Sequence, residues 1–174
     1  MMDDDDKGAY PAIVSEAEWV QRKRFVGFGP ADEKILRELH LLARSYADEV
    51  MDELYRRWLH MPELQRFFPN DTILRRVKAL QRQYFISLTE GEYGAAYLAY
   101  RLQIGRVHQR IGLSPRWYMG AYTIYLDLVL PKVMKGFEHD RTKQIQAVTA
   151  LMKIISLDQE LALVSYFSEI ATST

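Results

Sequence analysis

The chain has 174 residues, of which 48% are hydrophobic and 26% are charged, and 23 Lys and Arg residues balance 23 Asp and Glu residues. This length and composition fit one globular domain and exclude a disordered low-complexity chain. Nine Gly and six Pro residues are too few for the many turns of a β-sandwich or barrel, so a mostly helical fold is expected. Cys is absent, which excludes disulfides, thiolate metal ligands and a cysteine nucleophile.

The N-terminal segment is acidic. Asp3 to Lys7 read DDDDK, which resembles the enterokinase recognition sequence of expression tags, and a natural acidic tail is the alternative. We expect residues 1–12 to be flexible and residues 13–174 to form one domain. Without the DDDDK segment the net charge is +3, which is too weak and too dispersed to predict a nucleic-acid or membrane surface. No apolar run approaches the roughly 18 residues that cross a bilayer and no signal peptide is recognisable, so a cytoplasmic protein is expected.

Capping residues and apolar spacing predict helices in the first third of the chain. Ser15 and Glu18 form a capping box before a short helix that runs to about Arg24. Pro30 fits the first turn of the next helix, in which apolar residues recur every three or four positions up to His60. This pattern is consistent with one bent helix or with two consecutive helices.

Three shorter helical segments are expected in the middle of the chain. Residues 62–68 predict a helical corner with two aromatic residues. A helix over residues 73–88 follows, with Asp71 or Thr72 as its cap, and another spans residues 95–110.

Two long helices complete the prediction. Ser114 can cap a helix over residues 115–135, in which Pro131 is expected to kink the last turn. Residues 140–171 contain neither Gly nor Pro and predict a final helix. No strand and no internal repeat is recognisable, so the fold class is all-α.

Histidines are the main candidates for metal ligation. The four histidines are His40, His60, His108 and His139. No two of them have the spacing of a helical two-His site, so a zinc hydrolase is not expected, and no Gly-rich phosphate loop is present. Judged by itself, His108 reads as a structural or surface histidine, and His40 and His139 read as surface residues.

The context of His108 changes this reading. Residues 104–122 (IGRVHQRIGLSPRWYMGAY) resemble the proximal-histidine segment of the globin-coupled sensor family. The resemblance extends from about Val26 to Tyr166. It includes residues 52–64 (DELYRRWLHMPEL), the pair Phe67 and Phe68, and residues 76–81 (RVKALQ). It implies a globin fold with an additional N-terminal helix and no clear D helix, non-covalently bound haem b, and the binding of O₂ or another diatomic gas.

The same resemblance implies roles for three residues. His108 takes the place of the proximal iron ligand, and a neutral imidazole suits that role. Tyr118 matches a tyrosine on the proximal side that can bond to this imidazole, and a plain core aromatic is the alternative. Tyr55 matches a distal tyrosine that donates a hydrogen bond to bound gas, worth about 1.5–3 kcal/mol when the acceptor is charged. The alternative for Tyr55 is packing with Trp58.

The remaining cofactor contacts are apolar. Val77 and Leu80 match the distal positions that face the ligand. A polar residue occupies the second of these in some relatives, so Leu80 argues against a distal site with two donors. Trp58, Phe67 and Phe68 are candidates to pack on the porphyrin, although such aromatics are more often plain core.

The leading hypothesis is a haem-based gas sensor domain, without enzymatic activity of its own, that binds O₂, CO or NO and signals to an output module absent from this chain. That module is expected to be a kinase, a cyclase or a chemotaxis transducer, and a complete single-domain sensor is the alternative. Two other function classes stay open: a protoglobin-like haem enzyme (NO dioxygenase, nitrite reductase or peroxidase) and a haem-free helical interaction domain.

A homodimer through the two C-terminal helices is also expected. Apolar residues form two lines around the last helix, which is more than one core requires. One line is Ile145, Val148, Met152, Ile155 and Ala162, and the other is Leu151, Ile154, Leu157, Leu161, Val164 and Phe167. Pairing with a symmetry mate would create a four-helix bundle. The alternative is that the N-terminal segment around Trp19 covers the wider stripe.

Overall fold

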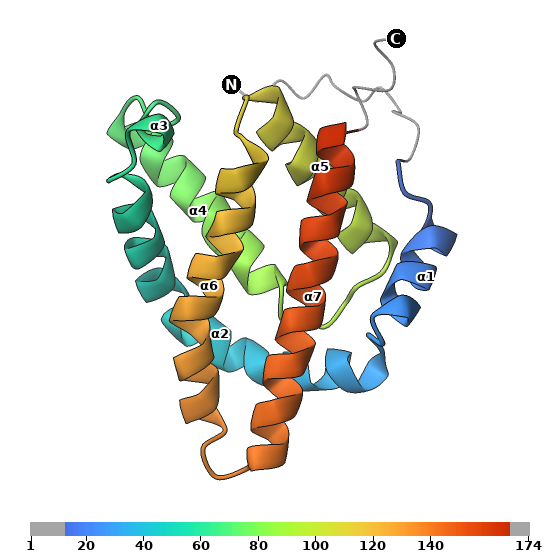
Figure 1. Cartoon of the computed structure of the whole chain (residues 1–174). Coiled ribbons are helices and arrows are strands. Elements are labelled where there is room, and N and C mark those ends of the chain that lie inside the picture. The colour runs from blue at the N-terminus through green and yellow to red at the C-terminus, as the bar shows by residue number, and fades with distance from the viewer. Residues whose placement is uncertain (1–12, 168–174) are drawn as a thin grey trace.

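The computed structural model describes residues 13–167, which form seven α-helices and no strand. The helices are α1 (Glu16–Phe25), α2 (Pro30–Trp58), α3 (Pro62–Gln65), α4 (Asp71–Ser87), α5 (Ala95–Arg110), α6 (Pro115–Gly136) and α7 (Arg141–Phe167). Figure 1 shows α6 and α7 side by side in opposite directions, while α2 crosses behind both of them. The all-α expectation is confirmed. The expectation for residues 1–12, and the end of the predicted last helix, lie outside the described residues.

The long second helix is continuous. Residues 30–58 form α2 without interruption, and Figure 1 shows that it curves before it reaches α3. Pro30 occupies its first turn, and the Gly29 amide donates to Asp32 Oδ2 at 2.9 Å. Between α2 and α4 the chain forms only the short α3, as a globin fold without a clear D helix requires.

Two caps differ from the prediction. Asn70, rather than Asp71 or Thr72, caps α4, and its Oδ1 accepts from the Ile73 amide at 2.9 Å. The reason is that the helix begins at Asp71, so the residue before it reaches the third amide of the first turn. At α1, Ser15 Oγ accepts from the Glu18 amide at 3.2 Å, but the Glu18 carboxylate pairs with Arg22 instead of completing the capping box.

The first helix, α1, packs over the beginning of α5. The Trp19 indole is buried and donates to the Tyr93 carbonyl at 2.8 Å, and Lys23 Nζ donates to the same oxygen at 2.9 Å. Arg22 also pairs with Glu160 of α7 at 2.9 Å. These two basic residues therefore hold α1 against the segment before α5 and against α7.

Helices α5 and α7 approach closely at Gly105. A Cβ built on this glycine would lie 2.6 Å from Ser165 Cβ and 3.2 Å from the Ala162 backbone. Ser165 is fully buried, and its hydroxyl donates to the Leu161 carbonyl at 3.0 Å. The absence of a side chain at Gly105 thus permits the close crossing of the helix that carries His108.

The apolar lines on α7 are only partly exposed. Ile155 and Ala162 are buried, because α2, α5 and α6 all pack against this helix. Ile145 and Met152 remain 59% and 54% exposed. Within residues 13–167, no helix combines the length and hydropathy needed to cross a membrane.

Candidate functional site

A cavity of about 560 Å³ lies between α4, α5 and α6 and is closed at one end by α3 and the end of α2. Its volume falls in the range of about 300–1,000 Å³ that is common for ligand pockets. The lining includes seven of the eight predicted site residues, namely Trp58, Phe67, Phe68, Val77, Leu80, His108 and Tyr118. Tyr55 is not among the lining residues.

His108 lies in the last turn of α5. Its Nδ1 is 2.8 Å from the carbonyl oxygen of Ile104, which is one turn earlier and accepts a hydrogen bond from the neutral ring. Burial lowers the pKa of His108, so the neutral form is favoured. The Nε2 lone pair is then available as a metal ligand, with the ring orientation fixed by the bond at Nδ1.

Tyr118 lies beside the imidazole, as the resemblance implied. Its ring meets the His108 ring edge to face, with centroids 4.8 Å apart. Its hydroxyl, however, lies 3.1 Å from the hydroxyls of both Tyr84 and Tyr122. In this structure Tyr118 therefore contacts the imidazole through its ring, and its hydroxyl belongs to a cluster of phenols.

The phenol cluster ends at a buried ion pair that we did not predict. Tyr84 donates to Asp158 Oδ2 at 3.1 Å, Tyr97 donates to Oδ1 at 2.6 Å, and Arg101 Nε lies 3.2 Å from Oδ2. Burial raises the pKa of Asp158, while Arg101 and the two phenols oppose this rise. A signal was present in the sequence, because Asp158 follows Ile154 and precedes Leu161 on the apolar face of a helix.

The opposite wall of the cavity comes from α4 and the α3 corner. Val77 faces the cavity, whereas Leu80 lies at its rim and is 45% exposed. The aromatic residues Trp58, Phe67 and Phe68 close the end nearest α3. Arg76 is the only Lys or Arg among the described residues that line the cavity.

Tyr55 lies just outside this lining. Its ring packs against Trp58 and Phe68, with centroid distances of 5.1 and 5.5 Å. Its hydroxyl is buried and has no hydrogen-bond partner among the described residues. A buried hydroxyl without a partner costs about 1–3 kcal/mol, so a ligand that accepted its hydrogen would remove that cost.

Gln81 and Tyr125 are among the polar residues of the cavity that the sequence analysis missed. Gln81 of α4 and Tyr125 of α6 both line it, and the Gln81 amide nitrogen donates to the Tyr125 hydroxyl. Gln81 follows Val77 by one helical turn, which is the signal that could have found it.

The other histidines lie outside the cavity. His60 Nδ1 lies 2.5 Å from the Arg56 carbonyl, and the His139 side chain is fully exposed, as expected. His40 is half-buried, with Nδ1 3.1 Å from Thr89 Oγ1, and is thus less exposed than predicted.

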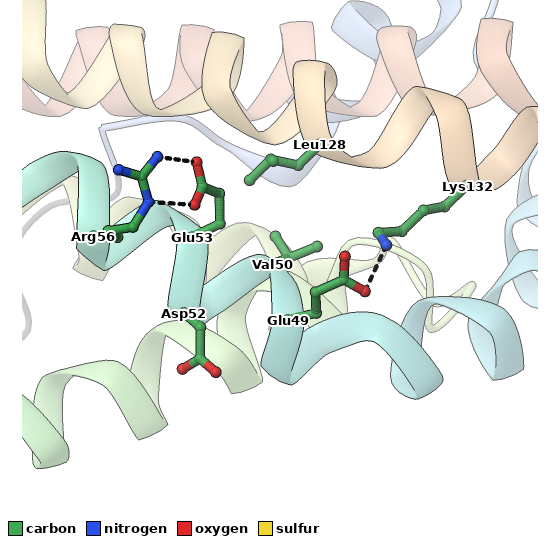
Figure 2. A pocket seen from close by; sticks show the side chains of 7 residues that line it. All are labelled: Glu49, Val50, Asp52, Glu53, Arg56, Leu128 and Lys132. Atoms are coloured by element: carbon green, nitrogen blue, oxygen red, sulfur yellow. Dashed lines mark hydrogen bonds and ion pairs between the residues drawn. The ribbon is translucent and has the colours of Figure 1, made fainter.

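A second hollow of about 390 Å³ lies between α2 and α6. Figure 2 shows two ion pairs among its charged side chains, one between Arg56 and Glu53 and one between Lys132 and Glu49. Asp52, which also lines the hollow, pairs with Lys78. These neutralised pairs leave the hollow without a recognisable ligand chemistry.

The main cavity suits a flat cofactor that brings its own metal. Among residues 13–167, no three His, Cys, Asp or Glu side chains converge to hold a metal ion. A haem iron requires a single imidazole from the protein, and apolar and aromatic walls suit the porphyrin. Within residues 13–167, neither Nε2 of His108 nor the Tyr55 hydroxyl has a hydrogen-bond partner, and these two atoms fit the two sides of such a group.

Comparison with known proteins agrees with this geometry. Residues 15–171 match the protoglobin family. Over 167 residues the chain is 28% identical to the heme-based aerotactic transducer HemAT of Halobacterium salinarum, in a match that covers 91% of this chain and 34% of that protein. The chain thus spans about a third of the length of this relative.

Comparison of the fold with solved structures agrees with the sequence matches. The structure resembles the globin domain of a Geobacter sulfurreducens globin-coupled sensor with a TM-score of 0.80 and 26% identity, covering 84% of this chain and 96% of that one. The chain belongs to the protoglobin family, as a globin domain of the globin-coupled sensor type.

Proposed function

We propose that this domain is a haem-based sensor of O₂ or another diatomic gas, in which His108 ligates the iron of a non-covalently bound haem b. The observation that carries the proposal is the environment of the His108 imidazole. Its imidazole is half-buried, burial lowers its pKa and so favours the neutral form, its Nδ1 is bonded to Ile104, and it lines the cavity. When bound, the haem supplies the iron that holds the gas.

Other residues in and beside the cavity bind the gas, restrain the imidazole and contact the haem. Tyr55 donates its unpartnered hydroxyl hydrogen to the gas on the distal side. Tyr118 restrains the imidazole through its ring. Arg76 pairs with a propionate, since it is the cavity-lining guanidinium of the described chain. The apolar contacts with the porphyrin come from Trp58, Phe67, Phe68, Val77 and Leu80.

Haem reconstitution of the purified protein tests this function. We expect stoichiometric binding with a Soret band, and loss of the axial bond in His108→Ala, partly restored by added imidazole. His60→Ala is the matched control, since His60 is exposed and lies outside the cavity. Unchanged haem content and an unchanged ferrous spectrum in His108→Ala would remove His108 from the proximal role. No haem uptake by the wild type would leave a haem-free interaction domain.

Signalling requires an output module, and we propose one covalently linked in the full-length protein. HemAT is a transducer, and the match covers only a third of it. A histidine kinase, a cyclase and a chemotaxis transducer are the candidate outputs. The cytoplasmic location stays a prediction of the sequence.

A homodimer through α6 and α7 stays part of the proposal. Met134, Ile145 and Met152 are large apolar residues exposed on these two helices, whereas α1 covers the side of α7 near Glu160. Pairing with a second copy would cover them in a four-helix bundle. Such a bundle would let a small shift at His108 change the packing between subunits.

Sedimentation at micromolar concentration tests the interface. We expect a dimer for the wild type and a monomer for Met152→Asp, with Phe25→Asp as the control because Phe25 is 92% exposed on α1. Ile155 is unsuitable for this test since it is buried within one chain. A monomeric wild type would refute the interface.

A further inference from the structure

The distal wall of the cavity contains polar side chains besides Val77 and Leu80, the two apolar residues that match the ligand-facing positions of the family. Gln81 follows Val77 by one turn of α4, so the two side chains share a face of that helix. Tyr125 reaches the same cavity from the middle of α6. The two meet through a hydrogen bond from the Gln81 amide nitrogen to the Tyr125 hydroxyl oxygen.

This hydrogen bond leaves the Tyr125 hydroxyl free to donate. A phenol carries one hydrogen and can also accept. Gln81 supplies a hydrogen to the oxygen, and no residue within 13–167 accepts the hydrogen that Tyr125 itself carries. A hydroxyl that accepts one hydrogen bond also becomes a stronger donor for the next.

Tyr125 and Tyr55 lie close enough to influence each other. Burial is the main factor that raises the pKa of Tyr125; Gln81 lowers it and the nearby Tyr55 raises it further. Both phenols are buried, and each lacks an acceptor for its hydrogen among the described residues. Tyr125 therefore offers an unused donor in the lining of the cavity, and Tyr55 offers a second one just outside that lining.

We propose that Tyr125, oriented by Gln81, is a second hydrogen-bond donor to a polar diatomic ligand in this cavity, beside Tyr55. The proposal rests on the proposed gas-binding function and deepens it. A ligand with negative charge on its outer atom gains from both donors, whereas a weakly polarised ligand gains little. The pair Gln81–Tyr125 thus selects O₂ over CO, although Val77 and Leu80 are apolar.

The haem-loaded Tyr125→Phe variant tests this role. We expect O₂ dissociation to accelerate by about threefold to tenfold, as for the loss of one hydrogen bond, and CO dissociation to change much less. The C–O stretching frequency of the CO complex should rise, because a donor to the ligand lowers it. An unchanged O₂ rate together with an unchanged C–O frequency would overturn the proposal.

Variants of Gln81 test the orientation without altering the buried phenol. Gln81→Glu offers only acceptor oxygens when ionised, so it should capture the Tyr125 hydrogen and reproduce the Tyr125→Phe rates. Gln83→Leu is the control, because Gln83 is exposed on the same helix. Rates for Gln81→Glu equal to those of the wild type would contradict the role of Gln81. Thermal unfolding of each haem-free variant verifies the fold.

The double variant Tyr55→Phe/Tyr125→Phe tests whether Tyr125 donates a hydrogen bond to the ligand itself or only positions Tyr55. Two independent donors predict that the two rate factors multiply. If the Tyr125→Phe effect vanishes when Tyr55 is already replaced, Tyr125 only positions Tyr55 and the proposal is wrong. Failure of the gas-binding function itself would appear differently, as loss of haem or gas binding in the wild type.

Discussion

Arg101 Nε lies 3.2 Å from Asp158 Oδ2, and the two side chains are 1% and 0% exposed. The guanidinium also lies over the ring of Tyr84 at 4.0 Å and over that of Tyr97 at 4.3 Å. Removal of one member leaves an uncompensated buried charge, which costs about 3–5 kcal/mol. We therefore expect Asp158→Ala to lower the free energy of unfolding by about that amount, as measured by urea denaturation.

The surface pair Lys132–Glu49 is the matched control. Its nitrogen–oxygen distance is 2.6 Å, but the Glu49 side chain is 71% exposed. Solvent screens such pairs, so Glu49→Ala should cost no more than about 1 kcal/mol. The double replacement Arg101→Met/Asp158→Leu should cost less than Asp158→Ala alone, since no charge stays buried. Equal costs for Asp158→Ala and Glu49→Ala would show that burial does not govern this pair.

Tyr55→Phe should accelerate O₂ release roughly tenfold or more, because the lost hydrogen bond is charge-assisted, and should affect CO much less. The haem-free protein should respond in the opposite sense, with a higher melting temperature. The reason is that the Tyr55 hydroxyl is buried without a described partner, and Phe removes that unpaired group. Stopped-flow kinetics and calorimetry measure the two effects. Equal acceleration for both gases would mean that Tyr55 acts sterically.

Gly105→Ala should destabilise the protein. The new methyl group would lie 2.6 Å from Ser165 Cβ, so α5 and α7 must separate. Such overpacking costs about 1–3 kcal/mol, or roughly 2–4 °C of melting temperature per kcal/mol at this size. Gly120→Ala is the control, because nothing lies within 4 Å of its added Cβ, and it should be neutral or stabilising. A neutral Gly105→Ala would contradict the close crossing.

Glu53 should contribute stability that is lost in acid. Arg56 donates two hydrogen bonds to its carboxylate at 2.6 and 2.7 Å, as Figure 2 shows, and Arg57 donates a third at 2.9 Å. Arg56 and Arg57 lower the pKa of Glu53 from 4.5 to about 2. The contribution is therefore complete above pH 4.5 and disappears as the pH falls towards 2.

The measurement for Glu53 is unfolding as a function of pH. Glu53→Gln should be less stable than the wild type near neutral pH, and the difference should shrink between pH 4.5 and about 2. Glu63→Gln, at an exposed glutamate, is the control and should not lower the stability near neutral pH. A difference that stays constant over this range would exclude the ion pairs as its cause.

The sequence analysis predicted the helices well because their signals are local. Helix α5 has the predicted bounds, and Pro30 marks the start of α2 as expected. His108 was predicted to be the iron ligand from the contiguous motif that surrounds it. The cap at Asn70 was missed because a shift of one or two residues at a helix end changes the sequence pattern very little.

The missed parts of the site depend on contacts between distant segments. Arg101 and Asp158 lie on different helices, and each reads as a solvated charge until the packing of α5 on α7 is known. Gln81 and Tyr125 likewise can be recognised as cavity residues only when it is known that α4 and α6 face the same cavity. Helical periodicity assigns residues to faces of one helix, but it does not say which faces meet.

The Tyr93 carbonyl oxygen receives hydrogen bonds from both Trp19 and Lys23, and it lies two residues before the start of α5. The helix whose last turn carries His108 is therefore anchored at its other end by a segment that does not line the cavity. Removal of α1 would deprive this carbonyl of both donors and uncover the aromatic rings of Tyr93 and Tyr97. The hydrogen bonds and ring contacts of the N-terminal helix thus restrain the beginning of α5.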